Sequence, residues 1–286
     1  MRRPAVRITA AALLGGLGLV LAVALAMTLR PTPESLRAEE QRQRWAAIQR
    51  DLAAGKPVTL IGETGPPAHF SWRCGGSTAG TGQADDGTFA AHCLEHGLLE
   101  LVAAPAQERY RFRAEVRHDQ GHLPEGQVGI YFAHSEQATA AAPAHCFAAV
   151  ALNDLWRQRP ALPQGGFPPN ELRLYLYQQP PAGLQRDSIS VGEPDYPFEF
   201  PAPGDRPWSR LAVEITPERV RVYCGDRRII DCPRGAMAEA FRSMGRSGLA
   251  PLAGEPAFAP WEGLGLYVSQ GGASFRAVVV EPLEGD

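Results

Sequence analysis

Residues 109–117 alternate strictly between apolar and charged side chains. The apolar members are Tyr110, Phe112, Ala114 and Val116. Successive side chains of a β-strand point to opposite faces, whereas an amphipathic helix repeats every three to four residues, so the alternation predicts a strand. One face of this strand would pack in a core and the other would face water, as in antiparallel sheets.

The same period of two recurs along the chain and determines the predicted fold class. Turn residues separate the runs, since the chain has 30 glycines and 26 prolines, and Gly225-Asp226 is typical of a two-residue hairpin turn. The sequence therefore predicts an all-β antiparallel sandwich over residues 56–286, with one short helix at 236–243. The other predicted strands are 57–61, 69–73, 88–93, 98–102, 128–132, 146–152, 171–177, 211–215, 220–224, 227–230, 264–268 and 274–281.

An uncharged run at the N-terminus is long enough to cross a bilayer. Residues 8–29 would form a helix of about 33 Å, and Arg2, Arg3 and Arg7 precede it,. We expect a transmembrane signal anchor with the N-terminus inside, which makes the chain a single-pass protein of the cell membrane with its bulk outside the cytoplasm. A cleaved signal peptide is the alternative, because residues 24–26 have the Ala-x-Ala form of a cleavage site.

A short helical stalk is predicted after the anchor. Thr32-Pro33-Glu34 has the form of a helix start and Gly55 that of a helix end,. One face of this helix carries apolar side chains, which would either dimerise or dock on the sandwich. The predicted domains are thus a cytoplasmic tip and anchor at 1–30, the stalk at 31–55 and the sandwich at 56–286.

Composition and motifs exclude several classes of function. The net charge is −3 and no basic stripe interleaves with aromatic residues, which argues against a nucleic-acid partner,. The sequence has no Gly-x-Ser-x-Gly elbow, phosphate-binding loop, dinucleotide fingerprint or His-Glu-x-x-His motif,. These patterns give no support for an enzyme of the corresponding classes.

Three pairs of segments carry a resemblance to a known superfamily: 110–116 with 128–132, 208–215 with 219–223, and 263–268 with 274–281. Together they resemble the concanavalin A-like lectin/glucanase superfamily, and within it the laminin-G-like and keto-disaccharide-hydrolase-like jelly rolls of planctomycete bacteria. The resemblance covers most of residues 56–283 and implies a jelly roll of two packed antiparallel sheets, one of them curved with a concave face. It transfers no catalytic residue, because this fold hosts lectins, hydrolases and scaffolds alike.

The charged and aromatic residues of the predicted wet strand faces are the candidate ligand site. If they share the concave face, tyrosine and arginine side chains could stack on and hydrogen-bond a sugar or a peptide. The alternative is a cross-strand ladder of arginine and glutamate on an ordinary solvent face. The candidates are Arg111, Arg113, Glu115, Tyr131, Glu214, Arg221, Tyr223, Tyr267 and Arg276.

Catalytic and metal-binding patterns are incomplete in this sequence. Residues 193–199 approach the paired carboxylates of a glucanase, but the motif is one residue too long,. Its two internal prolines also oppose a central strand. The pairs His92/His96 and His118/His122 have the spacing of metal ligands on a helix but fall at predicted strand ends or turns. We therefore predict no metal ligand, and for calcium only a weak candidate, the acidic turn Asp85-Asp86-Gly87.

The five cysteines offer two candidate disulfides, Cys74–Cys93 and Cys224–Cys232, while buried thiols are the alternative for each,. The function that these observations favour is a membrane-anchored, extracytoplasmic β-sandwich module. It would bind a cell-envelope carbohydrate or protein, or serve a structural role, without catalysis. A glycoside-acting hydrolase of the keto-disaccharide type is the alternative.

Overall fold

The computed structural model describes residues 33–75, 78–121, 126–138, 143–153, 170–178, 187–190, 206–246 and 255–284. Two compact units make up the chain, Met1–Arg44 and Trp45–Asp286. The predicted anchor at residues 8–29 lies outside the described residues. Of the helices within them, none combines the length and the apolar character that crossing a membrane requires. The anchor and the predicted division into domains therefore stay predictions.

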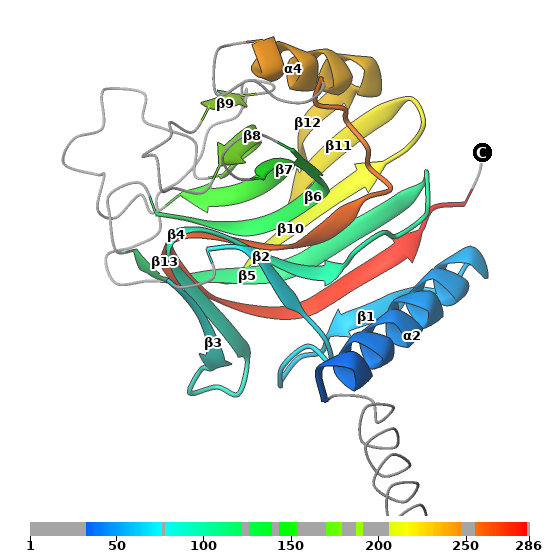
Figure 1. The fold of residues 1–286 in the computed structure, drawn as a ribbon. Helices are drawn as coiled ribbons and strands as arrows, with labels where there is room; N and C mark the ends of the chain where they lie inside the picture. The colour runs from blue at the N-terminus through cyan, green and yellow to red at the C-terminus, as the bar shows by residue number, and fades with distance from the viewer. Residues whose placement is uncertain are drawn as a thin grey trace, which may run out of the picture. The chain divides into compact units, whose positions relative to one another are not determined.

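The second unit is an all-β structure whose thirteen strands pair antiparallel in one continuous sheet (Figure 1). Its main path runs in the order β12-β11-β10-β5-β13-β6-β7-β8-β9, and β1, β2, β3 and β4 join it at β13 or β4. The strands are β1 Val58–Ile61, β2 Ser71–Cys74, β3 Ala79–Gln83, β4 Phe89–Val102, β5 Tyr110–Gly121, β6 Gln127–Gln137, β7 Ala144–Asn153, β8 Asn170–Gln178, β9 Asp187–Ser190, β10 Ser209–Ile215, β11 Arg219–Cys224, β12 Arg227–Pro233 and β13 Gly263–Pro282.

Strand β13 belongs to both layers of the sandwich, the first with β5, β10, β11 and β12 and the second with β6, β7, β8 and β9. Its first half, Gly263 to Ser269, pairs with β6, and its second half, Gly271 to Pro282, pairs with β5. A register shift separates the halves at Gln270, whose φ is 53°, and such a bulge bends a strand,. The sequence predicts two strands here and two more within β4. The structure corrects both to single long strands, because a bulge interrupts the residue pattern without ending the ladder.

The main core lies between the layers. The alternation predicted for residues 109–117 is confirmed in β5, where Tyr110, Phe112, Ala114 and Val116 are at most 1% exposed. They pack in one cluster with side chains of the other layer, such as Ile130, Val150 and Leu174. The predicted hairpin turn is also confirmed, since Gly225 and Asp226 connect β11 to β12 and Gly225 has a φ of 61°,.

Two helices accompany the strands. Helix α4, Arg234–Arg246, was expected at 236–243. It buries Met237, Phe241 and Met244, spaced three to four apart, in the main core,. Helix α2, Pro33–Ala53, ends as predicted at Gly55, where Lys56 N–H bonds the Asp51 carbonyl at 2.9 Å in a left-handed cap,.

The end of α2 belongs to the second unit and packs against the sandwich. Leu52 is 1% exposed within the main core, and Ile48 packs against that core. The Gln49 side chain donates a hydrogen bond of 2.7 Å to the Ala104 carbonyl. The sequence left open whether the stalk dimerises or docks on the sandwich. Its last turns dock on the sandwich.

Candidate functional site

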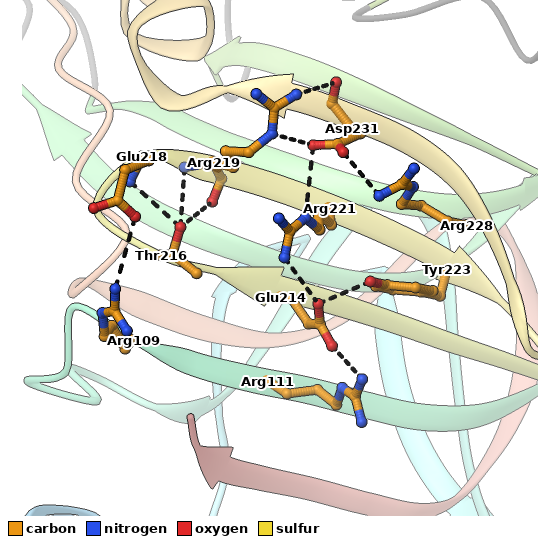
Figure 2. A network of polar contacts seen from close by, with 10 residues as sticks. All are labelled: Arg109, Arg111, Glu214, Thr216, Glu218, Arg219, Arg221, Tyr223, Arg228 and Asp231. Carbon is orange, nitrogen blue, oxygen red and sulfur yellow. Dashed lines mark hydrogen bonds and ion pairs between the residues drawn. The ribbon is translucent and has the colours of Figure 1, made fainter. Parts of the chain in front are cut away.

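Seven of the nine candidate ligand residues lie together on the solvent side of the first layer. Figure 2 shows four of them, Arg111, Glu214, Arg221 and Tyr223. Glu214 of β10 stands in register with Arg111 on β5 and with Arg221 on β11. Its carboxylate accepts a hydrogen bond from Arg111 and one of 2.8 Å from the Tyr223 hydroxyl, and Arg221 approaches to 3.9 Å. The members of this Arg–Glu ladder are Arg111, Arg113, Glu115, Glu214, Arg221, Tyr223 and Arg276.

The ladder continues on both sides of Glu214. Asp231 of β12 binds Arg219 and also Arg228, the latter at 2.9 Å. On the other side, Arg276 donates to Glu115 at 2.7 Å and its guanidinium lies 4.3 Å from the ring centroid of Trp208. Every arginine and carboxylate of the Arg–Glu ladder thus has an opposite charge within the protein. These contacts form the cross-strand ladder of arginine and glutamate that the sequence analysis gave as the alternative to a ligand site. Ligand binding by these seven residues stays a prediction.

The other two candidates lie elsewhere. Tyr131 and Tyr267 are 0% exposed, so the prediction that they share a wet face with the seven is wrong. The reason is that β6 and β7 of the second layer are buried on both faces along most of their length. Tyr131 and Tyr267 belong to a second buried cluster, the aromatic face, which consists of Cys74, Leu98, Tyr131, Phe147, Ala149, Ala151, Tyr175, Tyr177 and Tyr267.

The rings of the aromatic face contact one another across neighbouring strands. Phe147 stacks on Tyr175 with ring centroids 4.9 Å apart and an angle of 12°. His96 Nδ1 lies 2.9 Å from the Tyr267 hydroxyl, and the His96 ring lies 4.8 Å from that of Tyr177. Small residues make room for the rings, since the cross-strand partners of Tyr131 are Gly265 and Ala149.

A bulge brings polar side chains to the same face. The register of β6 against β7 shifts between Phe132 and Ser135, and Ala133 has a φ of 55°. Without this shift, residues 131, 133 and 135 would share a face, because a strand alternates with period two. With it, His134 follows Tyr131 on the aromatic face, and the two rings meet edge to face at 5.8 Å.

The polar group at this end of the face is formed by Arg73, Glu100, His134, Glu136 and His145. Arg73 donates to Glu100 at 2.5 Å, and Glu100 is only 2% exposed. Glu100 Oε2 lies 4.0 Å from His134 Nδ1, and His134 Nε2 lies 3.0 Å from His145 Nδ1. Glu136 is the exposed member, and it is the cross-strand partner of His145.

Burial perturbs the titration of this polar group. Burial, together with His145 and Arg73, lowers the pKa of His134 to about 3. Burial also lowers the pKa of His145, and it raises the pKa of Glu100 although Arg73 opposes the rise. The Tyr131 hydroxyl, whose pKa burial likewise raises, has no hydrogen-bond partner in the part of the chain that the structure describes. Perturbed groups gathered in one place make this polar group a candidate functional site.

No family model and no curated protein matches the sequence. Among solved structures, the chain is similar to the carbohydrate-binding module CBM66 from Bacillus subtilis. The TM-score is 0.44 and the identity 11%, over 78% of this chain and 98% of that one. A second B. subtilis protein, with a galectin-like fold, gives a TM-score of 0.41 and 11% identity over 74% and 89% of the two chains.

Domain 4 of AbnA, an arabinanase from Geobacillus stearothermophilus solved with arabinotriose, gives a TM-score of 0.32 and 12% identity over 82% and 88% of the two chains. Likenesses this distant carry no argument about the ligand or the activity of the present chain. The resemblance to the concanavalin A-like superfamily stays a prediction beyond the all-β architecture that the strands themselves show.

Neither candidate disulfide is formed, since all five cysteines are free thiols. Cys232 stands opposite Val220 on β11, four residues from Cys224, which is about 13 Å along a strand and beyond the reach of a disulfide,. Cys74 lies in the aromatic face and Cys93 in the main core. The Cys74 thiol donates instead to the His96 carbonyl at 3.2 Å.

The remaining sequence candidates are not brought together. Residues 193–199 and His122 lie outside the described residues. His92 is exposed whereas His96 is buried against Tyr267. In the acidic turn, Asp86 accepts two hydrogen bonds from Thr88, which lower its pKa to about 2, and it pairs with Arg117 at 2.8 Å. The oxygens of Asp86 thus hold the turn together.

The sequence reasoning missed the polar group because it looked for histidines four residues apart. A strand places residues two apart on one face, so the signal was His134-x-Glu136 just after the predicted strand at 128–132 and His145 directly before the one at 146–152,. Glu100 gave no signal, because a single glutamate in the middle of the apolar run 98–102 looks like an ordinary solvent-facing position of a strand,.

Titration of thiols tests the absence of disulfides. In denaturant without reductant we expect five thiols per chain to react with a chromogenic disulfide reagent. In the native protein, Cys74 and Cys146 should react slowly, because burial raises the pKa of both thiols, that of Cys146 to about 12,. Three reactive thiols in denaturant would instead mean that one disulfide forms.

Proposed function

We propose that the aromatic face binds a carbohydrate and does not catalyse its conversion. The observation that carries this proposal is the Tyr131 hydroxyl, a fully buried polar atom without a partner in the described residues, set among aromatic rings and next to a charged pair. Ligand sites combine apolar rings with a few polar groups that fix the orientation of the ligand. A buried polar atom without a partner is uncommon and calls for a functional reason.

The chemistry of the face suits a sugar. The apolar side of a pyranose ring can stack on tyrosine, and its hydroxyls can bond to Tyr131, to Arg73 and to Glu100. Arg73 has about a third of its side chain exposed and Glu136 is exposed, so solvent reaches the side chains at this end of the face. The rings beyond it are closed to solvent, which suits a short or terminal sugar.

We further propose that residues 8–29 anchor this module in the cell membrane, with the sandwich outside the cytoplasm and residues 31–55 as its stalk. The support is the uncharged N-terminal run with arginines before it,. The proposed ligand is accordingly a glycan of the cell envelope.

A second candidate is the glycoside-acting hydrolase. It is favoured by Glu100 and Glu136, two carboxylates on either side of His134, one buried with a raised pKa and one exposed. A raised pKa suits a general acid. The ion pair with Arg73 opposes this role, because the positive charge of Arg73 favours the ionised form of Glu100 and counteracts the rise in its pKa.

Glycan-array binding by the full-length chain in mild detergent tests the proposal. Tyr131→Phe keeps the ring and removes the hydroxyl, and we expect at least a tenfold loss of affinity for the glycan bound. Tyr223→Phe is the matched control, since it removes a hydroxyl from the Arg–Glu ladder and should leave binding unchanged. Equal binding by Tyr131→Phe, or binding to no glycan, would overturn the proposal. If the unmodified chain releases sugar from a glycan and Glu136→Gln does not, the result would favour the hydrolase.

A further inference from the structure

We propose that His134, Glu136 and His145 bind a divalent transition-metal ion, with zinc as the type case. One ligand atom from each of the three lies within 4.8 Å of the other two. The proposal stands apart from carbohydrate binding, because it requires only these side chains and the groups that hold them.

The spacing of the ligand atoms suits a metal ion. Zinc lies about 2.0–2.2 Å from histidine nitrogen and carboxylate oxygen, so ligand atoms in a tetrahedral site are about 3.4 Å apart. His134 Nε2 and His145 Nδ1 are 3.0 Å apart, and their rings are nearly parallel at 17°. Slight opening of this pair admits the ion. Glu136 supplies the third ligand from the exposed side, where water can take the fourth position.

Glu100 and Arg73 form the support behind the ligands. A histidine that binds metal through one nitrogen commonly presents its other N–H to a carboxylate, which sets the tautomer. Glu100 Oε2 lies 4.0 Å from His134 Nδ1, so this carboxylate favours a proton on Nδ1 and leaves Nε2 for the metal. Arg73 holds Glu100 in place at 2.5 Å.

The backbone is also arranged for this cluster. A Cβ at Gly263 would lie 2.9 Å from Glu100 Oε2 and 3.3 Å from His134 Nδ1, so only glycine admits the two side chains at their present positions. The bulge that brings His134 to the face has Ala133 at a positive φ, which is costly for any residue with a side chain,. Strain of this kind is typical of functional sites.

The ligand types select the class of metal. Two imidazoles and one carboxylate favour zinc, cobalt, nickel or copper over calcium and magnesium, which prefer oxygen ligands. No thiolate takes part, because Cys146 points into the main core although it neighbours His145. A bound cobalt ion should therefore show the visible bands of nitrogen and oxygen ligation without a thiolate charge-transfer band.

The test is titration of the full-length chain, stripped with a chelator and kept in mild detergent, with Co²⁺ followed by absorbance and with Zn²⁺ followed by calorimetry. We expect one ion per chain. His145→Ala and Glu136→Gln should each weaken binding by roughly a hundredfold, and Glu100→Gln by about 10–100-fold. His92→Ala, which removes an exposed histidine outside the cluster, should bind as the unmodified chain does.

Glu136→Gln keeps the test decisive if a histidine variant fails to fold, because residue 136 is exposed. Less than one ion per chain, an affinity that Glu136→Gln leaves unchanged, or a thiolate band in the cobalt spectrum would each overturn the proposal. The metal is titrated without any glycan, so failure of carbohydrate binding would leave this result unaffected.

Discussion

Gly129→Ala is expected to prevent the sandwich from folding to a stable state. Gly129 lies on the aromatic face of β6, where a Cβ would overlap the Val150 carbonyl oxygen of the neighbouring strand and lie 2.9 Å from the Ala151 Cα. These are backbone atoms, so neither can turn aside as a flexible side chain would. Overpacking by one methyl costs about 1–3 kcal/mol where side chains can adjust, and we expect at least the upper end of that range here.

Denaturant unfolding followed by circular dichroism measures this effect as a fall in midpoint, or as a failure to obtain soluble protein. Gly82→Ala is the matched control, since nothing lies within 4 Å of a Cβ at that position in β3. It should be neutral or stabilise by about 0.4–1 kcal/mol, because alanine restricts the unfolded chain. An unchanged midpoint for Gly129→Ala would mean that β6 and β7 are not paired in this register.

Arg73→Met is expected to cost about 2–3 kcal/mol of the free energy of unfolding. The substitution keeps the apolar stem of the side chain but leaves the Glu100 carboxylate, 2% exposed, without its counter-charge,. The expected loss lies at or below the lower end of the range of about 3–5 kcal/mol for a broken buried pair, because about a third of the Arg73 side chain is exposed. The free energy of unfolding in urea measures it.

Glu100→Gln added to Arg73→Met should recover part of the loss, because a neutral amide is cheaper to bury than an unpaired charge. Arg113→Met is the control from the Arg–Glu ladder, where a partly exposed pair with Glu281 at 3.6 Å should contribute less than about 1 kcal/mol,. Additive effects of the two substitutions at Arg73 and Glu100 would show that the pair does not couple.

The sequence predicts the first layer better than the second. Strand β5 has one wet face, so its alternation is visible in the residues. Strand β7 is buried on both faces, and its run of alanines, valine and phenylalanine indicates a strand without saying which face is which,. The Arg–Glu ladder could be foreseen as one of two interpretations, whereas its geometry depends on a register that residues alone do not determine.

The position of the polar group on the aromatic face could not be predicted from the sequence, for a different reason. It depends on a one-residue bulge at Ala133, which changes the face on which every following residue lies,. An alanine in the sequence does not predict a positive φ, because glycine and asparagine are the residues that usually adopt one. The assignment of Tyr131 to a wet face is wrong for a separate reason, because both faces of β6 are buried along most of its length.

Strand β13 comes late in the sequence, but the other strands need it in order to assemble into the sheet. Among the strands that the structure describes it comes last along the chain, yet it lies at the centre of the sheet, between β5 and β6 and along β4. Until residues 263–282 emerge, these strands have no common partner and expose backbone groups that other chains can pair with. The sandwich therefore cannot close strand by strand as it is translated. A chain stopped before β13 would leave the edges of β4, β5 and β6 without this partner, and we expect it to aggregate,.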